Sequence, residues 1–185
     1  MFILVTGANG QLGKSIKNLV ERDNISHSFT FVSREQLDLS SLNDIQNYFK
    51  THKFDLIINC AAYTAVDRAE HYKKDANMIN HLAVKQIAEI AKSNNIKLIH
   101  ISTDFVFDGL KHKPYFESDT TSPLNVYGNT KLAGENAVLS IMKFNAIIIR
   151  TSWIYSEYGN NFVDTILKLI QKKSDLNIVS DQIGT

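Results

Sequence analysis

The chain begins with a short apolar run that leads into three glycines spaced three residues apart. Residues 2–6 (FILVT) have the composition of a buried parallel strand. Gly7, Gly10 and Gly13 follow, and residues 11–22 carry apolar side chains at helical spacing. A strand, a glycine turn and a helix in this order present free N–H groups that bind phosphate, although an ordinary turn is the plainer alternative. The segment therefore predicts a βαβ unit that holds the pyrophosphate of a dinucleotide.

Apolar strands alternate with amphipathic helices along the rest of the chain. Further strands are predicted at residues 28–33, 55–60, 97–102, 145–150 and 176–179. Helices are predicted from Ser40 or Ser41 to about residue 52, and at 75–94, 126–142 and 161–173. This alternation implies right-handed crossovers and an α/β fold with a doubly wound parallel sheet of the Rossmann NAD(P)-binding type. We expect residues 1–185 to form one such domain.

Charge and composition exclude several classes of partner. Lys and Arg number 20 and Asp and Glu 19, which gives a net charge of +1 and offers no electrostatic surface for nucleic acid or an anionic membrane. The single cysteine, Cys60, excludes an internal disulfide and a cysteine-based zinc site. We see neither a membrane-spanning run nor a signal peptide, and therefore expect a cytoplasmic protein.

Polar residues follow each predicted strand at the point where it ends. They include Gly7, Ser33-Arg34, Ala61-Ala62-Tyr63, Thr103-Asp104 and Ser152-Trp153. Because the carboxyl ends of parallel strands lie at one edge of a sheet, these residues should meet there, where such folds bind ligands.

The residues after the second strand bear on the choice of nicotinamide cofactor. Ser33 and Arg34 offer a hydroxyl and a guanidinium to the 2′-phosphate of NADPH, while Glu35 leaves NADH open. Alternatively, Arg34 is a solvated surface residue. Asp38 and Leu39 would lie near the adenine, unless Asp38 only begins the next helix.

Three side chains form a candidate reaction centre. Tyr127 and Lys131 are four residues apart and so share one helical face. We expect the Lys131 ammonium to lower the pKa of Tyr127, which would then act as a general acid while Thr103 holds a substrate carbonyl oxygen. Taken singly, Thr103 could be a cap, Tyr127 a half-buried aromatic and Lys131 a solvated charge.

These residues resemble the dTDP-4-dehydrorhamnose reductase family of the extended short-chain dehydrogenase/reductases. The glycine turn is common to the whole superfamily, whereas the Ala-Ala-Tyr-Thr-Ala-Val-Asp, Thr-Asp-x-Val-Phe and Thr-Ser-Trp segments are more specific. The segments that carry the resemblance are Gly7–Gly13, Asn59–Glu70, Ser102–Gly109, Pro123–Lys131, Arg150–Tyr155, Gly159–Val163 and Ser180–Thr185.

The resemblance implies reduction, with NADPH or NADH, of the 4-keto group of dTDP-4-dehydro-β-L-rhamnose to give dTDP-L-rhamnose. Thr103, Tyr127 and Lys131 would be catalytic, with the last two also contacting the cofactor. The other expected cofactor residues are Gly7, Asn9, Gly10, Gln11, Leu12, Gly13, Ser33, Arg34, Asp38, Leu39, Ala61, Ala62 and Tyr63. The nucleotide-sugar substrate would meet Val66, Asp67, Thr103, Asp104, Phe105 and Trp153.

Two departures from the family's pattern affect these expectations. Phe105 stands where the family usually has Tyr, which leaves the identity of the sugar open. Related 4,6-dehydratases carry a proton-transferring Glu at this place, so Phe105 favours reduction over dehydration. The family also continues beyond Thr185, and we expect its C-terminal sugar-nucleotide-binding domain to be largely absent from this chain.

Several alternatives stay open at this point. The substrate could be another nucleotide 4-keto-deoxysugar, or the chain could be a non-catalytic, NADP-binding regulatory subunit of the methionine adenosyltransferase type. Some family members bind Mg²⁺, but no ligand cluster for a metal is evident here, and a homodimer remains open. Asn80 would support the site through backbone contacts or lie on a helix surface.

Overall fold

Five parallel strands form the centre of the computed structural model, which describes residues 1–159, 161–172 and 175–177. The strands are β1 (Phe2–Thr6), β2 (Ser28–Val32), β3 (Leu56–Asn59), β4 (Lys97–Thr103) and β5 (Ala146–Thr151). Their order in the sheet is β2-β1-β3-β4-β5, and every neighbouring pair is parallel. The predicted doubly wound sheet is confirmed, and the strand order changes direction between β1 and β3, where such folds bind ligands.

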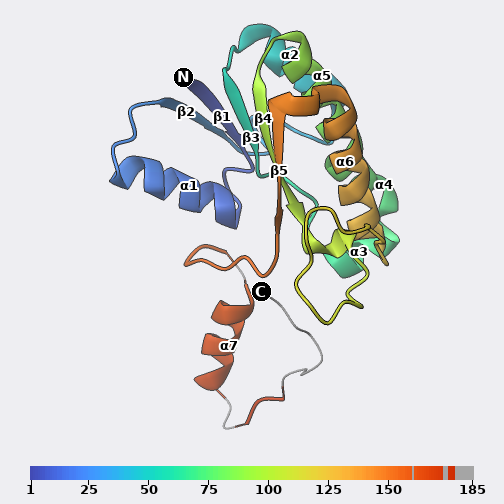
Figure 1. Ribbon diagram of the computed structural model, residues 1–185. Coiled ribbons are helices and arrows are strands. Elements are labelled where there is room, and N and C mark those ends of the chain that lie inside the picture. The colour runs from blue at the N-terminus through green and yellow to red at the C-terminus, as the bar shows by residue number, and fades with distance from the viewer. Residues whose placement is uncertain (160, 173–174, 178–185) are drawn as a thin grey trace.

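Helices cover both faces of this sheet. Figure 1 shows α1 on one side and α2, α5 and α6 together on the other. The helices are α1 (Gln11–Arg22), α2 (Leu42–Thr51), α3 (Val66–His71), α4 (Lys73–Asn77), α5 (Ala83–Ser93), α6 (Val126–Met142) and α7 (Phe162–Ile170). Short turns complete the described elements: a π turn η1 (Met78–Leu82) and the 3₁₀ turns η2 (Asp104–Val106) and η3 (Lys143–Asn145). No helix in the described ranges is both long and apolar enough to cross a bilayer.

The hydrophobic core lies between the sheet and the layer formed by α2, α5 and α6. Ile57 of β3, Leu98 of β4, Ile87 of α5 and Val138 of α6 are all buried in one cluster. Burying each such side chain contributes about 1.5–3 kcal/mol. The layer therefore fixes α6, which carries Tyr127 and Lys131, against the carboxyl half of β4.

Three expectations about the elements require correction. The helix predicted over 75–94 is not one α-helix, because the π turn η1 separates α4 from α5. The α3 helix was not predicted at all. At the proposed strand 176–179, residues 176–177 have no regular structure and the remaining two lie outside the described residues.

Candidate active site

A large cavity runs along the carboxyl edge of the sheet. Its volume is about 1060 Å³, and it extends from the glycine turn after β1, past the ends of β2 and β3, to Tyr127 and Lys131 of α6. Every residue that the sequence predicted for the cofactor lies in its lining. The walls thus come from segments far apart in sequence that meet at the switch point between β1 and β3.

The glycine turn leaves no room for side chains where the chain bends into α1. Gly7 has φ +69°, and a Cβ there would lie 2.8 Å from the amide nitrogen of Ala61. A Cβ on Gly13 would lie 2.3 Å from the carbonyl oxygen of Gly7. Gly10, at the N-cap of α1, has no side chain to cap the free N–H groups. These residues fit a pyrophosphate, which the exposed N–H groups and the helix dipole would bind.

Sequence reasoning missed part of the cavity wall. Ile154 and Gly159, after β5, line the cavity, and Gln11 of α1 donates from Nε2 to the Ile154 carbonyl oxygen over 2.9 Å. Arg68 and Tyr72 also line it, and both accompany the unpredicted α3 helix. Arg68, Ile154 and Gly159 belong to segments that carry the family resemblance, but no local signal assigns them to the cofactor, because tertiary packing brings them to the cavity.

At the far end of the cavity, Arg34 and Asp38 form an ion pair. Arg34 Nε lies 3.4 Å from Asp38 Oδ1, and the Arg34 side chain is 75% exposed. The same Asp38 oxygen accepts hydrogen bonds from the backbone N–H and the hydroxyl of Ser40 at 2.9 and 2.7 Å. The bond from the Ser40 backbone lowers the pKa of Asp38, which keeps this carboxylate charged.

The N-terminus of α6 is held in place by two side chains. Asn125 caps the helix, its Oδ1 accepting from the Gly128 N–H at 2.7 Å. Glu70 of α3 accepts from the Val126 N–H at 2.8 Å. Together they fix the helical turn from which Tyr127 and Lys131 reach the cavity.

The prediction that Lys131 lowers the pKa of Tyr127 is wrong in this structure. Burial raises the pKa of Tyr127, and a hydrogen bond with the Thr103 side chain opposes that rise. The Tyr127 ring meets Phe105 edge to face, with 5.6 Å between ring centroids. The Lys131 ammonium instead donates to the Ile101 carbonyl oxygen over 2.6 Å.

The six expected substrate residues fall into two groups, neither of which lines the cavity. The first group, which lies beside Tyr127, consists of Thr103, Asp104 and Phe105. The Asp104 carboxylate accepts two hydrogen bonds there, one from Thr103 Oγ1 at 3.1 Å and one from Ser152 Oγ at 3.0 Å. The second group consists of Val66 and Asp67, which lie on α3, and Trp153. The Trp153 ring packs edge to face on Phe162 with 5.4 Å between ring centroids. The structure thus brings only the first group to the reaction centre.

Asn80 connects the cofactor segment to the catalytic helix. Its Oδ1 accepts from the Tyr63 N–H at 2.8 Å, and its Nδ2 donates to the Tyr63 carbonyl at 3.1 Å and to Thr130 Oγ1 at 3.2 Å. The side chain is 1% exposed, so the surface alternative is wrong and backbone support is confirmed.

A buried polar chain crosses three strands beneath the cavity. Thr6 Oγ1 donates to Asn59 Oδ1 at 2.6 Å, and Asn59 Nδ2 lies 3.1 Å from His100 Nδ1. Because the amide nitrogen donates, His100 Nδ1 accepts and the proton sits on Nε2, which has no hydrogen-bond partner among the described residues. Burial lowers the pKa of His100 to about 3, and Lys131 adds to the shift.

This buried imidazole should make the fold sensitive to acid. The pKa of His100 in the folded chain lies below the ordinary value of 6.5, so the unfolded chain binds the extra proton first. We expect the free energy of unfolding to fall by up to about 1.4 kcal/mol per pH unit as the pH drops from 6.5 towards 3. Urea denaturation at pH 6.5 and pH 5 measures the loss. Whatever the stability of the His100→Leu variant, its free energy of unfolding should depend less steeply on pH than that of the wild type. An equal slope in both proteins would contradict the assignment of the acid sensitivity to His100.

No three His, Cys, Asp or Glu side chains come together as a metal site within the ranges that the structure describes.

The sheet order, the glycine turn and the cavity at the switch point define a Rossmann-type α/β protein. The chain belongs to the RmlD substrate binding domain family, whose model matches residues 1–185.

Individual relatives agree with this assignment. The chain is 42% identical to a dTDP-4-dehydrorhamnose reductase of Aggregatibacter actinomycetemcomitans, with 98% of the chain and 61% of that relative aligned. A solved dTDP-4-dehydrorhamnose reductase of Clostridium acetobutylicum superposes with a TM-score of 0.94 at 39% identity, covering 100% of this chain and 65% of that one. A Bacillus anthracis reductase solved in complex with NADP gives a TM-score of 0.86 at 35% identity, covering 93% and 60%. The chain therefore spans about three fifths of the curated relative's length.

Proposed function

We propose that the protein reduces the 4-keto group of dTDP-4-dehydro-β-L-rhamnose to give dTDP-L-rhamnose, using NADPH. The observation that carries the proposal is the placement of Tyr127 and Lys131 in the wall of a dinucleotide-sized cavity, with Thr103 hydrogen-bonded to Tyr127. Family membership and the reductases named above support the same reaction.

The residues of the chain divide the chemistry between them. The reduced nicotinamide, when bound, supplies the hydride. Thr103 holds the substrate carbonyl oxygen, and Tyr127 donates the proton that this oxygen needs as its charge develops. Lys131 lines the same cavity wall, where its ammonium would contact the bound cofactor. Phe105 contacts the Tyr127 ring edge to face and supports its orientation.

A related substrate is the second candidate. Phe105 lacks the hydroxyl usual at this position, which removes one hydrogen bond to a sugar. The chain is also 36% identical to a Streptomyces niveus protein named dTDP-4-keto-6-deoxy-D-glucose reductase, 62% of which is aligned. A different nucleotide 4-keto-deoxysugar would keep the same proton donor and cofactor.

Product identification tests the proposal directly. The intact protein is incubated with NADPH and a panel of nucleotide 4-keto sugars, and the products are identified by mass spectrometry and NMR. The proposal expects dTDP-L-rhamnose from the dTDP-4-dehydrorhamnose reaction. Turnover of a different sugar alone supports the second candidate, and tight NADPH binding without any turnover supports a regulatory subunit.

The cofactor preference should depend on Arg34. Because a guanidinium pairs with a phosphate monoester, we expect Arg34→Met to raise the NADPH dissociation constant about tenfold and to leave NADH binding unchanged. Fluorescence titration with both cofactors measures the change. Arg22→Met is the matched control, because Arg22 is an exposed arginine paired with Asp23 and lies outside the cavity lining. Equal losses for both cofactors, or better catalytic efficiency with NADH in the wild type, would contradict the NADPH preference.

The rest of the proposal concerns the whole protein. Residues 1–185 would serve as its NAD(P)-binding domain, with the remaining sugar-nucleotide pocket supplied by further sequence of the kind that its relatives carry. A cytoplasmic location fits a nucleotide-sugar substrate, and gel filtration would decide whether the protein forms a homodimer.

A further inference from the structure

The ammonium of Lys131 occupies one of the most enclosed positions in the chain. The side chain is 2% exposed, and the one hydrogen bond recorded for its Nζ within the described residues goes to the Ile101 carbonyl. Burial lowers the pKa of Lys131 to about 8, close enough to neutrality that small changes would alter its charge. The charge of Lys131 at neutral pH therefore depends on the groups around it.

Titratable groups near Lys131 come from the end of β3, from β4 and from α6. Cys60 follows β3 and His100 lies on β4, while Tyr127 and Glu135 lie on α6 itself. Burial raises the pKa of Cys60 to about 12 and lowers that of His100 to about 3, so both are neutral at pH 7. Tyr127 is neutral as well, because its pKa is raised. Glu135 is left as the anion among these groups.

Glu135 is well placed to act on Lys131. It lies four residues further along α6, which puts both side chains on one face of the helix. The Glu135 side chain is 1% exposed, so water screens its charge very little. Its charge raises the pKa of Lys131 and thus opposes the effect of burial.

Arg150 of β5 forms an ion pair with this buried carboxylate. Its Nε lies 3.0 and 3.2 Å from the two Glu135 oxygens, and its Nη2 lies 2.7 Å from Oε2. A charged side chain buried this deeply is costly unless it has such a partner. Three charge-assisted hydrogen bonds offset the cost of burying the carboxylate and fix its position.

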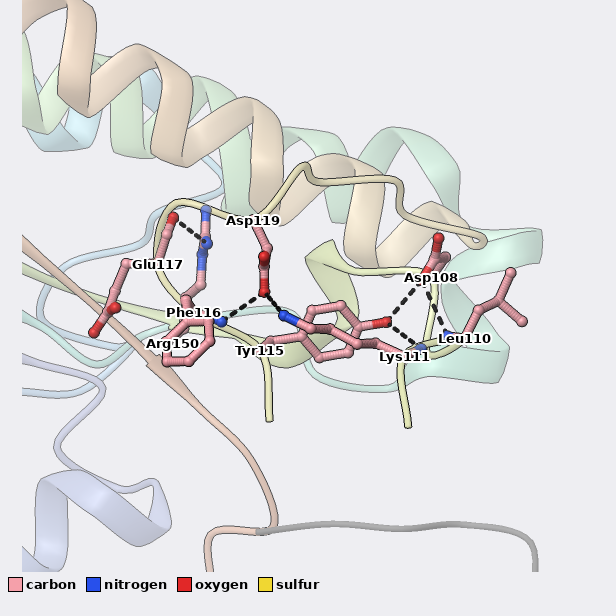
Figure 2. Close-up of polar contacts among 8 residues, drawn as sticks. All are labelled: Asp108, Leu110, Lys111, Tyr115, Phe116, Glu117, Asp119 and Arg150. Atoms are coloured by element: carbon pink, nitrogen blue, oxygen red, sulfur yellow. Dashed lines mark hydrogen bonds and ion pairs between the residues drawn. The ribbon is translucent and has the colours of Figure 1, made fainter. Parts of the chain in front are cut away.

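The guanidinium is itself held by the segment that follows the reaction centre. It lies 4.9 Å from the centroid of the Phe107 ring. It also donates to the Glu117 carbonyl oxygen over 3.5 Å (Figure 2). Figure 2 also shows polar contacts within residues 108–119: Tyr115 donates to Asp108 over 2.7 Å, and Lys111 pairs with Asp119. The contacts with Phe107 and Glu117 hold Arg150 in addition to its bonds to Glu135.

We propose that Glu135, held in place by its ion pair with Arg150, is a positioning residue that keeps Lys131 in its ammonium form at neutral pH. The role of Lys131 in catalysis rests on the proposed reductase function, whereas the electrostatic coupling between Glu135 and Lys131 does not. The two claims can therefore fail separately.

The test measures the titration of Lys131 itself. The intact protein is labelled with ¹³C at the lysine ε-carbons, the Lys131 signal is assigned with the Lys131→Arg variant, and its shift is followed from pH 6 to 11. In Glu135→Gln we expect the midpoint to fall by at least about one pH unit, a tenfold change in proton affinity. Glu135→Asp, which keeps the charge, should stay near the wild-type midpoint.

Two further variants make the result decisive. Glu89→Gln is the matched control, because Glu89 also lies four residues after a lysine, Lys85, but on an exposed part of α5; it should leave the Lys131 midpoint unchanged. If Glu135→Gln does not fold, the double variant Glu135→Gln/Arg150→Met, which leaves no unpaired charge, should show the same fall. An unchanged Lys131 midpoint in either folded variant overturns the proposal.

Activity provides a second measurement. If the protein is the proposed reductase, the alkaline decline of kcat/KM should move to lower pH in Glu135→Gln by the same amount as the Lys131 midpoint. A shifted midpoint without any activity in the wild type would reject the reductase function and keep the coupling. An active enzyme whose Lys131 midpoint does not move in Glu135→Gln would keep the reductase function and reject the coupling between Glu135 and Lys131.

Discussion

Replacing Tyr127 by Phe is expected to lower kcat at least about 100-fold, the usual contribution of a positioned general acid. The change removes only the phenolic oxygen, so the ring still packs against Phe105 and the cavity keeps its shape. NADPH affinity should therefore stay within about twofold of the wild type, a difference well under 1 kcal/mol. Single-turnover kinetics with the nucleotide sugar, together with fluorescence titration of NADPH, measure the two quantities separately.

Tyr155→Phe is the control for this experiment. Tyr155 loses the same hydroxyl group, but it is 68% exposed and lies outside the cavity lining. We expect its kcat to match the wild type. An unchanged rate in Tyr127→Phe would refute the proton-donor role, and a rate lost together with NADPH binding would indicate a structural role instead.

Gly13→Ala should have its largest effect on cofactor binding. The new Cβ would lie 2.3 Å from the Gly7 carbonyl oxygen, so the backbone of the glycine turn must move away from α1. Such overpacking costs roughly 1–3 kcal/mol. The cofactor-free turn can shift to relieve this strain, whereas the turn that holds the pyrophosphate cannot. The NADPH dissociation constant should therefore rise about tenfold to a hundredfold.

Gly10→Ala offers a graded comparison within the same turn. Its Cβ would lie 3.1 Å from the same Gly7 oxygen, a distance that a small adjustment can accommodate. We expect a markedly smaller loss of NADPH affinity than in Gly13→Ala, measured by the same titration. Equal affinities in both variants and the wild type would mean that this turn does not bind the pyrophosphate.

The sheet and the cofactor side of the cavity could be predicted from the sequence because their signals are local. The apolar run 2–6 and the glycines after it define a strand, a turn and a helix without reference to the rest of the chain. Ser41 gives the start of α2 in the same way, since its hydroxyl accepts from the Asp44 N–H. The topological rule for parallel sheets then places the strand ends together.

The features that escaped prediction depend on contacts between distant segments. Spacing correctly put Tyr127 and Lys131 on one face, but the sign of the pKa shift follows from how deeply Tyr127 is buried and from the Ile101 carbonyl that takes the Lys131 ammonium. Glu135 and Arg150 likewise meet only because α6 packs beside β5. The charge balance of the reaction centre is thus a property of the packed structure.

The π turn at Met78–Leu82 makes the register of the adjoining helices depend on a single inserted residue. An α-helix advances about 100° per residue, so the extra residue offsets α4 from α5 by that angle. Deleting one residue from this turn would let the segment relax to a continuous α-helix and rotate Asn80 away from Tyr63 and Thr130, while the apolar face of α5 stayed in the core. This short stretch should therefore tolerate many substitutions on its outer side but no change in length, a constraint that governs insertions and deletions rather than residue type.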